Sequence, residues 1–161
     1  MTTQDDIFSF LATPAAYGED STLAVRRIDT HGAAVFLAGD RVLKVKRAVR
    51  FPFLDYSTLE KRKAACAAEI EVNKRFAPAI YRGVTAITRE ADGALAVGGN
   101  GEPVEYAVDM TRFDEEQTLD HVAGRGGIDA ALADALGRVV AAGHAKAPAV
   151  APEPWIGALD S

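Results

Sequence analysis

The run RVLKVK at residues 41–46, followed by STLEKRKAACAAEIEVNKRF at residues 57–76, decides the fold. The first run alternates in polarity and is rich in valine, which predicts a strand, whereas the second predicts a helix. Because side chains alternate along a strand, Val42, Lys44 and Lys46 share one face of it. The two runs therefore predict a strand that presents lysines, followed by a helix that carries carboxylates.

The predicted helix begins at a capping box, in which the side chains of Ser57 and Glu60 satisfy free backbone donors. Glu69 lies beside the apolar stripe of this helix, whereas Glu71 is rotated away from Glu69 by about 200°. Glu69 is therefore the better partner for a lysine of the strand. The stripe consists of Leu59, Cys66, Ile70 and Asn73, and the residues expected to face outward are Lys61, Arg62 and Lys63.

Further segments extend this pair into an α+β fold with a five-stranded antiparallel sheet and one packed helix. The other four strands are expected at residues 23–28, 33–37, 83–89 and 105–110, separated by turn-forming residues. An amphipathic helix over residues 5–12 is expected to be a peripheral cover. Two more helices are predicted at residues 118–122 and 128–145.

Composition narrows the functional classes. The chain of 161 residues is 48% hydrophobic and 25% charged, which is typical of a globular protein with a core. Its net charge of -5 argues against nucleic acid as a partner. No apolar run approaches the roughly 20 residues that cross a bilayer, and no signal peptide is evident, so we expect no membrane partner and a cytoplasmic location. Cys66 is the only cysteine, which excludes an intrachain disulfide and favours a core position.

Lys44 and Glu69 are the candidate site residues that the pattern favours. A small apolar residue two positions before a lysine, here Val42, can cover an adenine while the lysine meets phosphates, and this spacing favours Lys44 over Lys46. Glu69 would hold the ammonium in place as the opposite charge. The same residues also fit a lysine-rich edge strand that resists aggregation, beside a helix with solvated glutamates.

Two longer runs resemble a known family. VFLAGDRVLKVKRAVRFPFLDYSTLEKRKAACAAEIEVNKRFAPAIY, at residues 35–81, is similar to the amino-terminal half of bacterial aminoglycoside phosphotransferase-like proteins, which have a protein kinase-like fold. The resemblance is to those members often joined to a second, P-loop ATP-binding domain. EYAVDMTRFDEEQTLDHV, at residues 105–122, resembles the fifth strand, the hinge and the first large-lobe helix of the same family.

The resemblance implies a division of the chain and a set of nucleotide contacts. Residues 1–110 would form a kinase-like small lobe, and residues 111–161 the hinge and a partial helical large lobe. ATP is the implied cofactor, and the family's reaction is ATP-dependent phosphoryl transfer to a hydroxyl of a small molecule. The implied contacts are Lys44 and Glu69 at the phosphates, Val42 above the adenine, the backbone between Met110 and Phe113 as the hinge, and Arg112 and Phe113 at the cleft entrance.

Two departures from the family pattern limit the expected activity. The turn at residues 29–32 holds one glycine where protein kinases carry a glycine-rich phosphate cover. The H-x-D catalytic motif has no counterpart, because His121 precedes Val-Ala and His144 precedes Ala-Lys. We therefore assign no catalytic or metal-binding residue, expect magnesium only together with a missing catalytic half, and expect this chain to bind nucleotide without turnover.

The alternative hypothesis is a non-catalytic binding module derived from a kinase small lobe. It predicts an exposed apolar seam along residues 128–145, through which the chain forms a homodimer or pairs with the missing carboxy-terminal half. A third idea is that the basic run from Lys44 to Arg50 binds an anionic partner. Trp155, in a proline-rich tail, is expected to cover an apolar seam.

Overall fold

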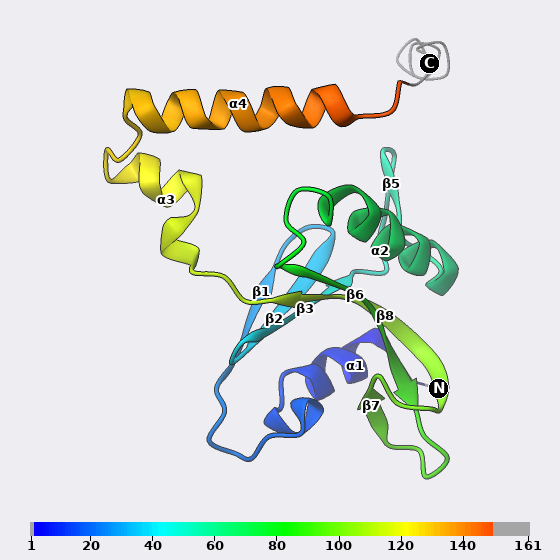
Figure 1. Ribbon diagram of the computed structural model, residues 1–161. Helices are drawn as coiled ribbons and strands as arrows, with labels where there is room; N and C mark the ends of the chain where they lie inside the picture. Colours follow the sequence, from blue (N-terminus) through cyan, green and yellow to red (C-terminus); the bar gives the residue numbers. More distant parts are fainter. Residues whose placement is uncertain (1, 150–161) are drawn as a thin grey trace. The chain divides into compact units, whose positions relative to one another are not determined.

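The computed structural model describes residues 2–149 and divides the chain between Phe113 and Asp114 into two compact units. In the described residues, the first unit contains the β-strands and the helices α1 and α2, and the second unit is helical (Figure 1). The predicted division after residue 110 into a kinase-like small lobe and a partial large lobe stays a prediction. Trp155, for which packing on an apolar seam was expected, lies outside the described residues.

The first unit is built on an antiparallel sheet of six strands in the order β1-β2-β3-β8-β6-β7, which confirms the α+β class (Figure 1). The strands are β1 (Val25–Asp29), β2 (Ala33–Ala38), β3 (Arg41–Lys46), β8 (Glu102–Thr111), β6 (Tyr81–Arg89) and β7 (Leu95–Val97). A separate ribbon pairs β4 (Arg50–Phe51) with β5 (Leu54–Asp55).

The predicted count of five strands is wrong, because β7 forms the sixth. This strand holds only three residues, which is too short for a clear alternation signal. It pairs with β6 because the chain reverses at Gly93, whose φ of 86° lies in the left-handed region that glycine adopts without strain. Gly101 then allows the next reversal, since a Cβ there would meet the Arg89 carbonyl oxygen at 1.9 Å.

Helix α1 (Gln4–Leu11) is part of the core, so the prediction of a peripheral cover is wrong. Ile7, Phe8 and Leu11 are buried, and the Phe8 ring lies 5.8 Å from the ring of Phe36 in β2. The physical reason lies in β2 and β3, whose apolar side chains alternate onto both faces of the sheet and require cover on each. The cluster on the α1 face also includes Ala34, Leu43, Val45, Ile87 and Ala107.

Helix α2 (Leu59–Asn73) packs on the opposite face, against β8, β6 and β3 (Figure 1). Its N-cap is Thr58, which accepts from the Lys61 backbone, and not the predicted Ser57, whose hydroxyl instead donates to Asp55. The helix ends at Asn73, before the predicted end near residue 76. Cys66 is fully buried, as expected from its place on the stripe.

The second unit contains a 3-10 turn, η2 (Glu115–Gln117), and the helices α3 (Leu119–Gly124) and α4 (Ala130–Lys146), close to the two predicted helices. Asp129 caps α4 by accepting a hydrogen bond of 2.8 Å from the Leu132 backbone. Among the described helices of both units, none combines the length and the apolar character that crossing a bilayer requires.

Candidate functional site

The structure brings together the two residues that the sequence singled out. Lys44, on β3, donates a hydrogen bond of 2.9 Å from Nζ to Oε1 of Glu69, on α2. The contact forms because β3 turns every second side chain toward the face on which α2 packs. Only 12% of the Glu69 side chain is exposed, whereas 31% of the Lys44 side chain is exposed. The pair thus presents its cation toward solvent.

Lys46 joins the same carboxylate, which the sequence did not predict. Its ammonium donates to Oε2 of Glu69 and lies 5.6 Å from the centre of the Tyr56 ring. The Lys46 side chain is 8% exposed, so this lysine is the deeper of the two. Glu71, set aside in favour of Glu69, is exposed and lies 3.7 Å from Arg75.

The two lysines determine the charge of Glu69. Burial raises the pKa of this carboxyl, but hydrogen bonds from Lys46 and Lys44, together with their charges, outweigh burial and hold the pKa below its usual value. Glu69 is therefore ionised at neutral pH. Two ammonium groups and one carboxylate give the cluster a net charge of about +1, which favours an anionic ligand.

Cross-strand register surrounds Lys44 with apolar side chains. One row crosses five strands on the α2 face and consists of Ile28, Val35, Lys44, Val108 and Val84. The neighbouring row consists of Arg26, Leu37, Val42, Met110 and Tyr81. Directly opposite residues in antiparallel strands lie about 5 Å apart at Cβ, so Val35 and Val108 flank Lys44 within its own row. The second row, which contains Val42, continues the apolar surface beside the lysine.

The predicted hinge uses two of its backbone donors within the protein. The Thr111 N–H donates to the Ile80 carbonyl and the Arg112 N–H to the Asp40 carbonyl, each over 2.8 Å. Among the described residues, no backbone acceptor engages the Phe113 N–H. The Phe113 side chain is exposed. The Thr111 and Arg112 donors of the predicted hinge are therefore already engaged within the protein.

A second ion pair, which the sequence analysis missed, lies beside the lysine cluster. Arg62 is buried and donates from Nε to both oxygens of Glu105 over 2.9 Å, so the prediction that Arg62 faces outward is wrong. Gln4 of α1 donates a further bond of 2.9 Å to Glu105, which is fully buried. A signal was present, since Arg62 lies four residues before Cys66 on the apolar stripe. The prediction that Arg62 faces solvent was based on its charge alone.

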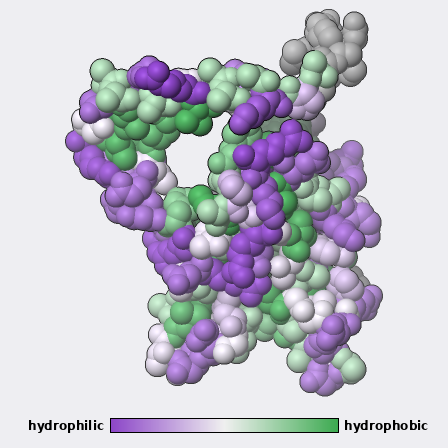
Figure 2. All heavy atoms as spheres, in the orientation of Figure 1, coloured by the Kyte–Doolittle hydropathy of each residue, from purple (hydrophilic) through white to green (hydrophobic). Residues whose placement is uncertain are grey.

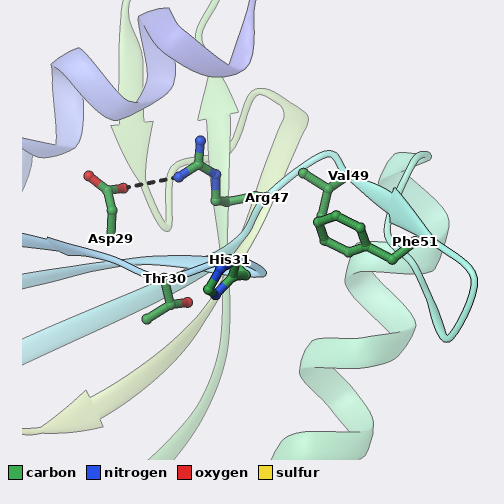
Figure 3. A pocket seen from close by; sticks show the side chains of 6 residues that line it. All are labelled: Asp29, Thr30, His31, Arg47, Val49 and Phe51. Atoms are coloured by element: carbon green, nitrogen blue, oxygen red, sulfur yellow. Dashed lines mark ion pairs between the residues drawn. The ribbon is translucent and has the colours of Figure 1, made fainter.

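The turn between β1 and β2 lies beside a separate open pocket of about 480 Å³ (Figure 3). Six residues line it: Asp29, Thr30, His31, Arg47, Val49 and Phe51. Figure 3 shows Arg47 directed toward Asp29, an ion pair of 3.7 Å between Nη1 and Oδ1. Neither Lys44 nor Glu69 lines this pocket, so the turn at residues 29–32 borders a different hollow.

Metal ligands are a separate question. Within residues 2–149, no three His, Cys, Asp or Glu side chains gather closely enough to hold a metal ion. The residues brought together at Lys44 and Glu69 are suited to an anion, and the carboxylate there is already occupied by two ammonium groups.

The comparisons with known proteins give relatives without a described activity. The chain is 38% identical over 120 residues to an uncharacterized protein of Mycobacterium bovis and, to the same extent, to uncharacterized proteins of two strains of Mycobacterium tuberculosis. The matched region is 74% of this chain but 22% of the length of each relative. No family model matches the chain. No solved structure matches it either.

Proposed function

We propose that this chain is the small-lobe part of an aminoglycoside phosphotransferase-like protein with a kinase-like fold, and that it binds ATP. The observation that carries the proposal is the contact of 2.9 Å between Lys44 on β3 and Glu69 on α2. In kinase-like folds a strand lysine, held by a helix glutamate, meets the nucleotide phosphates. Here the lysine keeps solvent access, while its partner is buried and ionised.

The surface beside Lys44 fits the base of the nucleotide. Val42 lies on the same face as Lys44, two residues earlier, and Met110 is its cross-strand partner on β8. Val42 is only 7% exposed and Met110 is partly exposed, so the apolar contact proposed for the flat face of adenine comes mainly from Met110. Phe113 lies just beyond the end of β8. In this proposal its backbone N–H donates a hydrogen bond to a ring nitrogen of adenine. Arg112 and Phe113 would then border the entrance.

ATP, when bound, supplies a γ-phosphoryl group, and we propose that the longer protein transfers it to a hydroxyl of a small molecule. This chain contributes the lysine that orients the phosphates and the buried glutamate that orients the lysine. The chain spans about a fifth of the length of the relatives that it matches. We therefore assign neither the acceptor nor the residues that activate it to this chain. Because ATP is a cytoplasmic metabolite, we place the protein in the cytoplasm.

A second candidate function, a dimerising module without catalysis, is favoured by the surface of the second unit. Ile128, Val139 and Val140 are exposed, with 45%, 63% and 54% of their surface accessible. Figure 2 shows apolar surface along α4, interrupted by hydrophilic side chains. Sedimentation over a hundredfold range of concentration tests this alternative. A monomer throughout would count against it.

Calorimetric titration with ATP and magnesium tests the nucleotide proposal. We expect wild type to bind and Lys44→Ala to lose most of its affinity, because the phosphates lose their cation. Lys61→Ala is the matched control, since it removes the same charge from an exposed residue that pairs with Asp55. Equal binding by wild type and Lys44→Ala would contradict the proposal, as would a folded wild type that binds no ATP.

A further inference from the structure

One carboxylate serves two ammonium groups of unequal depth. Glu69 accepts from Lys44 at one oxygen and from Lys46 at the other. The two lysines lie on the same face of β3, two residues apart, yet the side chain of Lys44 is 31% exposed and that of Lys46 is 8% exposed. A ligand that arrives from solvent therefore meets Lys44 first.

We propose that Lys46 is a positioning residue, which holds Glu69 by one carboxylate oxygen so that Lys44 is free to turn to the phosphates of a bound nucleotide. This inference rests on the proposed nucleotide binding and adds a residue to that site. Lys46 itself does not contact the ligand. Its burial beside the Tyr56 ring keeps it at the carboxylate when the ligand is present.

The charges explain why a second lysine is needed. If Lys44 were the only partner of Glu69, its movement to a phosphate would leave a buried carboxylate unpaired, which is strongly unfavourable. The pair would also be neutral, and Lys44 would be retained by Glu69. With Lys46 present, Glu69 keeps one ion pair throughout, and the net positive charge of the cluster attracts the phosphates.

A double substitution separates this role from a structural one. Lys46→Met removes the charge at similar length, and we expect its affinity for ATP to fall by about tenfold, because Glu69 then retains Lys44. Adding Glu69→Gln to Lys46→Met releases Lys44, and we expect affinity to recover to within about threefold of wild type. Lys46→Arg, which keeps the charge, should bind like wild type. Adenosine, which lacks phosphates, should bind all variants equally.

The outcomes distinguish this inference from the nucleotide proposal. If Lys44→Ala weakens ATP binding but Lys46→Met does not, only the role of Lys46 is wrong. A double variant that binds no better than Lys46→Met also overturns that role, because release of Lys44 from Glu69 would then have failed to restore affinity. Absence of ATP binding in wild type overturns the nucleotide proposal and this inference with it.

A measurement on the wild-type chain covers the case in which Lys46→Met does not fold. Nitrogen-15 spectra of the lysine side chains report each ammonium, and Lys44→Arg and Lys46→Arg assign the two signals. On addition of ATP we expect the Lys44 signal to shift and the Lys46 signal to keep its position. A shift at Lys46 as large as that at Lys44 would show that both lysines turn to the phosphates, and would overturn the inference.

Discussion

Replacing Arg62 by methionine removes one partner from the buried ion pair with Glu105. Removal of one partner from such a pair costs about 3–5 kcal/mol, because the remaining charge stays buried without compensation. Glu105 still accepts from Gln4 at 2.9 Å and from the Tyr106 backbone at 3.0 Å, so we expect the lower end of this range, about 3 kcal/mol. The protein should stay folded, since domains of this size have stabilities of about 5–15 kcal/mol.

Urea unfolding followed by circular dichroism measures the effect. With an m-value of about 2 kcal/mol per molar urea, a loss of 3 kcal/mol lowers the midpoint by about 1.5 M. Lys63→Met is the control, because Lys63 is the exposed neighbour of Arg62 on α2. Replacing both partners, as Arg62→Met with Glu105→Leu, should recover at least half of the loss.

Two results would refute this reasoning. A midpoint shift below about 0.5 M for Arg62→Met would mean that the pair is not desolvated as its burial indicates. A double variant no more stable than Arg62→Met would mean that the loss comes from packing of the arginine side chain and not from an uncompensated Glu105 carboxylate.

Three further predictions concern other parts of the first unit. The pKa of Glu69 is held below the ordinary glutamate value of 4.5, so this carboxyl contributes stability at neutral pH that is lost as pH falls below that value. The stability difference between wild type and Glu69→Gln should therefore shrink in acid, and a difference that stays constant between pH 7 and pH 3.5 would contradict this prediction. Phe8→Ala should cost about 3–5 kcal/mol in urea unfolding while Phe76→Ala, at an exposed position, costs little, and equal effects would show that α1 is peripheral after all. Burial raises the pKa of Cys66 to about 11, so a thiol reagent at pH 8 should react only after unfolding, and rapid reaction with the native chain would place Cys66 outside the core.

The periodicity of two elements was enough to predict the pairing partners at the site. A spacing of two along β3 places Val42 and Lys44 on one face, and the helical period places Glu69 nearer to that face than Glu71. The structure agrees on both points, because these rules depend on local geometry alone. Local geometry does not show how deeply a side chain is buried. It therefore did not reveal that Lys46, the more buried lysine, also binds Glu69.

The charged residues of the core escaped sequence analysis for a physical reason. Arg62 lies on the apolar stripe of α2, but a charge is buried only when a partner compensates it, and that partner, Glu105, is distant in the sequence. The role of α1 was missed in the same way, since its apolar face says nothing about which surface it covers. The use of the Thr111 and Arg112 donors also depends on tertiary contacts with Ile80 and Asp40.

Covalent labelling by an adenosine that carries a sulfonyl fluoride at its 5′ end examines the proposed nucleotide site directly. The reagent places an electrophile where the phosphates of ATP would lie, and peptide mass spectrometry identifies the lysine that it modifies. We predict modification at Lys44, prevented by an excess of ATP. Modification spread over exposed lysines such as Lys61 and Lys63, and unaffected by ATP, would contradict the assignment of Lys44 and Glu69 as a nucleotide site.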